Sequence, residues 1–170
     1  MKRSKMAVIG LGNRLLADEG AGMHALELLQ KKFEAEEENE TVHVDVDLIE
    51  AGTPGMNLLH QFDEREKIIF IDAGNCGIES GDYRRFSPDQ VISIKKSKGY
   101  SLHEFDLIHF LEFAKRMNIS DNIEIVIYCV QAAEVLMSEK LSPVVEKTLP
   151  GLVQTVYDEV TMGKHGGVHA

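Results

Sequence analysis

Three short runs of almost entirely apolar residues constrain the fold of this chain more than any other feature of its sequence. They cover residues 6–11, 67–72 and 123–130. Runs of this length without polar alternation are typical of strands that are buried on both faces. Stretches with helical periodicity separate the runs, so strand and helix alternate along the chain. The pattern predicts an α/β fold, a three-layer α/β/α sandwich around a central, mostly parallel twisted sheet.

Weaker signals predict the remaining elements. Alternating apolar and polar residues over 42–49 indicate a half-buried strand near an edge of the sheet. The S-x-x-E sequence at 101–104 is typical of a helix N-terminus. Ser142 as cap and Pro143 at the first helical position should begin the last helix. Pro150 should kink or break that helix. We also expect a short helix, a short edge strand and a solvated basic loop, at residues 56–62, 82–86 and 95–98 respectively.

The first helix should begin at Asp18 and Glu19, because negative charge at a helix N-terminus complements the helix dipole. Its inner face is predicted to carry four apolar residues, Ala21, Ala25, Leu28 and Leu29. A domain usually contains roughly 100–200 residues, so the 170 residues of this chain are enough for one. We therefore predict a single domain over residues 1–162, followed by a flexible C-terminal tail over residues 163–170.

The charge and cysteine content disfavour several classes of protein. Lysine and arginine number 18 against 28 aspartates and glutamates, and the resulting net charge of -10 disfavours binding to nucleic acid. No apolar stretch reaches the roughly 18 residues of a membrane span, so no membrane partner is expected. Two cysteines are too few for a disulfide framework. We therefore expect a reduced, cytoplasmic protein, with Cys76 reactive in a loop and Cys129 in the core.

Three polar residues stand at positions where open α/β sheets form their sites, beyond the carboxyl ends of strands. Glu19 follows the first strand by one loop, Asp72 ends the central strand, and His103 lies in the first turn of the capped helix. Two carboxylates and one imidazole suit a divalent transition metal of borderline hardness. Each residue also has a simpler explanation. Glu19 can complement a helix dipole, Asp72 can cap a loop, and His103 can lie on the surface.

Common catalytic and nucleotide-binding motifs are absent or incomplete. Gly10-x-Gly12 after the first strand is similar to the start of a dinucleotide loop, but Leu15 stands at the third glycine position. His103-Glu104 is followed by leucine at position 107, which excludes the H-E-x-x-H helix of zinc peptidases. Neither a phosphate-binding P-loop nor a G-x-S-x-G serine motif occurs. A nucleotide-binding α/β enzyme is therefore a weaker alternative.

Five segments of the chain carry a more specific signal, namely Gly10–Gly22, Glu50–Leu59, Ile68–Ala73, Ser101–Glu104 and Leu141–Val144. In order and spacing they resemble the signature of the hydrogenase maturation endopeptidases, and the resemblance spans about residues 6–160. Each segment alone is modest evidence, but five collinear matches make chance an implausible explanation. The chain departs from the family after its last central strand. There Cys129 replaces a common glycine, and Gln131 is followed by alanine where the family has proline.

The resemblance implies a phosphorylase/hydrolase-like fold and a specific proteolytic activity. These enzymes cut a C-terminal extension from the precursor of a [NiFe] hydrogenase large subunit after nickel has been inserted. The family's nickel-binding and catalytic positions map onto Glu19, Asp72 and His103. The nickel (Ni) is expected to arrive in the precursor and to act as its recognition element. Hydrolysis would be aspartic-type or metal-assisted, with water as the nucleophile and Asp18 as a secondary carboxylate. The alternative is a non-cleaving nickel-binding chaperone for hydrogenase assembly.

Overall fold

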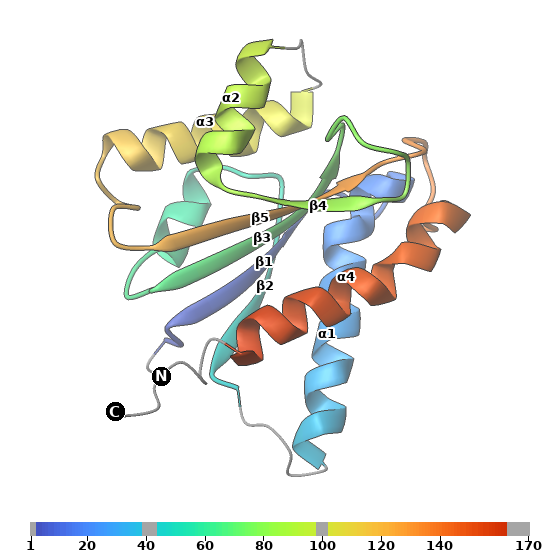
Figure 1. Cartoon of the computed structure of the whole chain (residues 1–170), viewed down its shortest axis with the longest axis horizontal. Coiled ribbons are helices and arrows are strands. Elements are labelled where there is room, and N and C mark those ends of the chain that lie inside the picture. Colours follow the sequence, from blue (N-terminus) through green and yellow to red (C-terminus); the bar gives the residue numbers. More distant parts are fainter. Residues whose placement is uncertain (1–2, 39–43, 98–101, 163–170) are drawn as a thin grey trace.

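One five-stranded sheet organises the part of the chain that the computed structural model describes, residues 3–38, 44–97 and 102–162. Its strands are β1 (Met6–Leu11), β2 (Val46–Gly52), β3 (Lys67–Gly74), β4 (Tyr83–Phe86) and β5 (Glu124–Gln131). The α-helices are α1 (Ala21–Glu38), α2 (Pro88–Ser97), α3 (Leu102–Arg116) and α4 (Pro143–Met162). Two 3-10 helices complete the described elements, η1 (Ala17–Gly20) and η2 (Met56–Gln61) (Figure 1). The three apolar runs therefore form strands β1, β3 and β5, as predicted.

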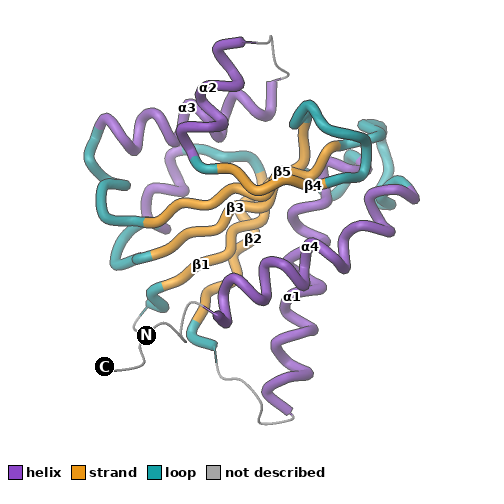
Figure 2. Tube along the Cα trace, viewed as in Figure 1, coloured by secondary structure: helices purple, strands orange, loops and turns teal. Residues whose placement is uncertain are grey.

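The strand order in the sheet is β2-β1-β3-β5-β4. Neighbouring strands among β2, β1, β3 and β5 pair in parallel, and β4 pairs antiparallel with β5. Figure 2 shows the five strands as one sheet between the helices. This order confirms the mostly parallel sheet, and it places the alternating strand β2 and the short strand β4 at the two edges. The carboxyl ends of the four parallel strands meet at one end of the sheet, which is where α/β proteins form their sites.

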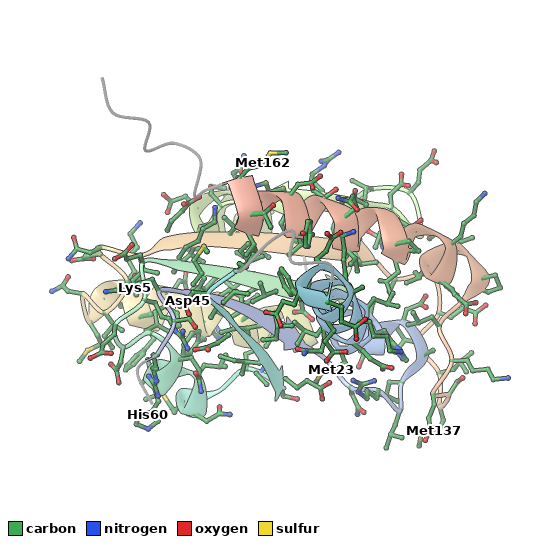
Figure 3. All side chains as sticks on the ribbon, turned by 90° about the horizontal axis from the view of Figure 1, so that it is seen from below. Lys5, Met23, Asp45, His60, Met137 and Met162 are labelled. Atoms are coloured by element: carbon green, nitrogen blue, oxygen red, sulfur yellow. A yellow bond between two sulfur atoms is a disulfide. The ribbon has the colours of Figure 1, made fainter. Side chains whose placement is uncertain are left out.

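Helices cover both faces of the sheet, because successive side chains of each buried strand point to opposite faces. Ile69 and Ile71 pack with α1 and α4 in one core cluster. Ile68 and Phe70, which alternate with them, pack with α3 and η2 in the other. Figure 3 shows these layers from another side, with Met162 of α4 and His60 of η2 on opposite sides of the sheet. The predicted three-layer sandwich is confirmed.

Two predictions about the first helix are wrong. Leu28 is 36% exposed, whereas Leu26 is buried at 3%. The buried face of α1 runs through Ala25, Leu26 and Leu29, and neighbouring residues point about 100° apart around a helix. Position 28 therefore falls outside the buried face. The helix also begins later than predicted, because Asp18 and Glu19 lie in η1 and α1 starts only at Ala21.

Lys95, Lys96 and Ser97 of the predicted basic loop are instead part of α2, and Lys98 lies outside the described residues. A capping box that the sequence analysis missed explains where this helix begins. The backbone N–H of Ser87 donates to the side chain of Gln90 at 2.8 Å, and the N–H of Gln90 donates back to the Ser87 hydroxyl at 3.4 Å. Pro88 occupies the first helical position, where its missing N–H costs nothing.

Pro150 does not break α4, which continues from Pro143 to Met162. A proline removes the amide that would bond to the carbonyl four residues earlier, here that of Glu146. Both residues lie on the exposed face of the helix, where water can bond to the released carbonyl oxygen. Of the predicted kink or break, the break is therefore wrong, and solvent exposure is the physical reason.

Some predictions concern residues outside the described part of the chain. The C-terminal tail, residues 163–170, is one of these segments, and residues 42 and 43 at the start of the predicted second strand are another. Of the helices that the structure describes, none is long and apolar enough to cross a lipid bilayer.

A charged cluster ties the end of α4 to the sheet. Glu159 of α4 pairs with Lys67 of β3 at 2.9 Å and with Arg85 of β4 at 2.8 and 3.1 Å, and it accepts a hydrogen bond from the Tyr128 hydroxyl of β5. Burial disfavours the ionised carboxylate, but the hydrogen bonds from Arg85, Lys67 and Tyr128 outweigh burial and lower the pKa of Glu159 from 4.5 to about 2. The cluster therefore stabilises the fold through the charged form of Glu159.

We expect Glu159→Gln to lower the free energy of unfolding by about 3–4 kcal/mol at pH 7, because the pKa falls from 4.5 to about 2 and one pH unit of pKa difference is worth about 1.4 kcal/mol. The folded-state pKa is the lower one, so the contribution is complete above about pH 4.5 and is lost as the pH falls through about 2. Urea denaturation between pH 2 and 7 measures this, with the neighbouring Asp158→Asn as control. If Glu159→Gln and the wild type lose stability equally between pH 4.5 and pH 2, the ionised Glu159 carboxylate does not stabilise the fold.

Candidate active site

A small pocket at the carboxyl end of the parallel strands brings Glu19 and Asp72 together. Glu19 belongs to η1, which follows β1 by one loop, and Asp72 lies near the end of β3. Gly12, Thr53 and Pro54 line the same pocket. Both carboxylates are half-buried, so water screens their attraction for a cation less than it would on an open surface. The structure therefore places two of the three predicted site residues at one pocket.

The third predicted site residue, His103, lies in the first turn of α3, and its side chain is outside the described part of the structure. Leu107 follows one turn later and lines a second hollow together with Asp72. The N-terminal half of α3 therefore lies beside the end of β3. Among the side chains that the structure describes, no group of three or more His, Cys, Asp or Glu is arranged to hold a metal ion. Of the three predicted metal ligands, the structure therefore describes the side chains of the two carboxylates, Glu19 and Asp72.

The glycines of the opening motif allow close backbone packing around Glu19. Gly12 has a φ of 115°, and a Cβ there would overlap the carbonyl oxygen of Glu19. The N–H of Gly12 donates to the Gly52 carbonyl at 3.0 Å, and that of Asn13 donates to the Glu19 carbonyl at 3.1 Å. A phosphate-binding loop needs such N–H groups for its ligand, but here protein carbonyls already occupy them. This geometry counts against the nucleotide-binding alternative.

Asp18 is fully buried and anchors a distant loop. Its carboxylate accepts hydrogen bonds from the N–H groups of Ala133 and Glu134 at 2.8 Å each, and from the N–H and hydroxyl of Ser142 at 2.7 and 2.8 Å. Ser142 was predicted to cap α4 with its side chain, but its hydroxyl donates to Asp18 instead. These bonds fix the backbone next to Glu19, so Asp18 holds the site in place, and it is not among the residues that line the pocket.

We expect Asp18→Asn to lower the free energy of unfolding by about 2–4 kcal/mol. The amide keeps the shape of the side chain but points an NH₂ group at N–H and O–H donors, and hydrogen bonds to a charged acceptor are worth about 1.5–3 kcal/mol each. Ser142→Ala removes one donor hydroxyl and should cost only about 1–2 kcal/mol. Chemical denaturation of both variants measures the difference. Equal stability of Asp18→Asn and the wild type would show that the charged Asp18 carboxylate does not stabilise the fold.

The two cysteines form a disulfide, and the expectation of a reactive Cys76 and a reduced core Cys129 is wrong. Cys76 lies in the loop after β3 and Cys129 lies in β5, with Cα atoms 6.3 Å apart, within the usual range for a bridge. Cys129 is the register partner of Asp72 in the paired strands β3 and β5. The bridge therefore holds the β3 loop beside a predicted site residue.

Gln131 supports the same loop from the end of β5. Its side-chain oxygen accepts hydrogen bonds from the N–H groups of Cys76 at 2.8 Å and Gly77 at 3.1 Å. The sequence contains one signal of this arrangement. Gln131 matches the glutamine that the hydrogenase maturation endopeptidases carry at this position. The contact itself joins residues more than fifty positions apart, so no local pattern could have predicted it.

Comparisons with known proteins identify similar sequences and similar structures. The sequence model of the HycI hydrogenase maturation protease family matches residues 23–159. The hydrogenase expression/formation protein HupD of Rhizobium leguminosarum bv. viciae is 32% identical over 100 residues, which cover 59% of this chain and 46% of HupD. The chain spans about half the length of the first curated relatives that it matches.

Solved structures share the fold. The hydrogenase maturating endopeptidase HybD from E. coli superposes with a TM-score of 0.74 at 21% identity, over 95% of this chain and 94% of HybD. The [NiFe] hydrogenase maturation protease HybD from Thermococcus kodakarensis also gives a TM-score of 0.74, at 23% identity, over 92% of this chain and 99% of that protein. Because the family match covers most of the domain, the chain belongs to the hydrogenase maturation protease family.

Proposed function

We propose that this chain is an endopeptidase that removes the C-terminal extension from the precursor of a [NiFe] hydrogenase large subunit after nickel insertion. The observation that carries the proposal is the pocket at which Glu19 and Asp72 meet, in a chain that belongs to the hydrogenase maturation protease family. The end of a parallel sheet is also where α/β enzymes bind their substrates.

The donor set fits nickel that arrives with the precursor. Glu19 and Asp72 offer carboxylate oxygens from one pocket. We propose that His103, a residue of the first turn of α3, supplies an imidazole nitrogen. Oxygen and nitrogen donors suit a borderline divalent ion such as Ni²⁺. The position of Leu107, one turn after His103 and lining the same hollow as Asp72, supports a place for His103 near the carboxylates. Nickel bound between precursor and protein would mark a loaded precursor as ready for cleavage.

Hydrolysis needs a water molecule, a base and a group that stabilises the polarised carbonyl. A divalent ion in such a site can supply that polarisation. The half-buried carboxylates of Glu19 and Asp72 can accept the proton of the attacking water. The water oxygen then bonds to the carbonyl carbon, the C–N bond breaks, and the proton passes to the departing amine. Asp18 is committed to four structural hydrogen bonds, so we assign it no part in this proton transfer.

Intact-mass spectrometry of a nickel-loaded large-subunit precursor incubated with the protein tests the proposal. The precursor should lose the mass of one C-terminal peptide, and casein should remain uncut under the same conditions. Co-purification of the two proteins with no change in precursor mass would instead identify a non-cleaving chaperone. Digestion of casein would identify a general peptidase.

A further inference from the structure

We infer that an apolar hollow beside Asp72 binds the side chain of a substrate residue that flanks the scissile bond. The inference rests on the proposed function and adds a specificity pocket to it. The hollow is lined almost entirely by apolar surface, from Phe86 of β4, Val91 of α2, Leu107 and Ile108 of α3, and Ile127 of β5. A polar side chain would lose its bonds to water there without replacement, so the pocket selects an apolar one.

The position of Asp72 connects the hollow to the proposed catalytic pocket. Asp72 lines the hollow and also the pocket that contains Glu19. Consecutive Cα atoms of a peptide are about 3.8 Å apart. A peptide bond held at the two carboxylates therefore places the side chain of an adjacent residue within reach of the hollow.

The described residues around the hollow also indicate the size of the side chain that it can take. Its walls are two helices and three strands, and the Cys76–Cys129 disulfide is part of its lining. Protein interiors are normally close-packed, so an unfilled apolar space that opens beside a site carboxylate is suited to a ligand. Its volume is about 60 Å³, whereas an engineered cavity of about 150 Å³ binds benzene. The hollow therefore suits a small aliphatic side chain, such as that of valine, and not an aromatic one.

Val91 offers a way to change the size of the hollow, because it is only half-buried and its replacement should leave the fold intact. The test uses precursors with Ala, Val, Leu or Phe at each residue flanking the scissile bond. It measures the rate at which the wild type, Val91→Ala and Val91→Phe cleave each precursor. Ile127→Val enlarges the hollow from the wall that β5 forms. Ile92→Ala is the matched control, because Ile92 lies next to Val91 in α2 but lines a different hollow.

At one flanking position, the wild type should cleave the Val precursor at least about tenfold faster, in kcat/KM, than the Phe precursor. Val91→Ala and Ile127→Val should shift the optimum toward Leu, and Val91→Phe should shift it toward Ala. Ile92→Ala should keep the wild-type order. The same order of preference in the wild type and all variants would show that the hollow does not bind the flanking side chain. The proposed cleavage would be unaffected by that result. If the wild type cleaves no precursor of the panel, the proposed function fails and the pocket fails with it.

Discussion

Glu19→Gln and Asp72→Asn are each expected to lower kcat/KM for precursor cleavage by about 10³-fold or more, with little change in stability. Both side chains line the site pocket, and each amide keeps the size of the side chain but loses the charge. A lost base alone costs about 10²–10⁴-fold, and weaker binding of the nickel-loaded precursor adds to the loss. His103→Gln should have a comparable effect, because an amide replaces the imidazole nitrogen.

Intact-mass time courses with nickel-loaded precursor measure these rates, and thermal denaturation checks that the variants are folded. Asp63→Asn is a suitable control, because Asp63 is an exposed carboxylate that pairs with Arg3 away from the pocket. Near-normal cleavage by Glu19→Gln or by Asp72→Asn would remove that residue from the site. Near-normal cleavage by all three variants would refute the proposed site as a whole.

Loss of the Cys76–Cys129 disulfide should lower the free energy of unfolding by about 3–4 kcal/mol. The bridge joins residues 53 positions apart, and bridges that close loops of this length restrict the unfolded chain by roughly this amount. Guanidinium denaturation with and without a phosphine reductant measures the effect. The double variant Cys76→Ala/Cys129→Ala is the control, because the reductant should not alter its stability. A wild type that is equally stable in both conditions would show that the bridge contributes nothing.

The sequence predicted the sheet well because burial on both faces leaves a direct mark on it. Strands β1, β3 and β5 are continuous apolar runs, and the alternation in β2 matched its place at an edge. The buried faces and the ends of the helices were harder to predict from the sequence. Leu28 and Leu26 are equally apolar, and only the packing of α1 against the sheet decides which one is buried. The sequence Ser87-Pro-Asp-Gln90 carries the S-x-x-Q pattern of the α2 capping box, so this helix start was predictable.

The candidate site was predictable where each residue follows a strand, and unpredictable where support comes from far along the chain. Glu19 and Asp72 were placed from local position alone, and they line one pocket. The role of Asp18 depends on donors more than a hundred residues away. The disulfide depends on the register of β3 and β5, which no spacing between two cysteines reveals.

The most direct test of the account is intact-mass spectrometry of one large-subunit precursor, prepared nickel-loaded and nickel-free, with equal amounts of the wild-type protein. If Glu19, Asp72 and His103 bind the nickel as proposed, only the loaded precursor should lose its C-terminal peptide. Cleavage of both forms at the same rate would contradict nickel recognition. Cleavage of neither form would contradict the proposed endopeptidase activity itself.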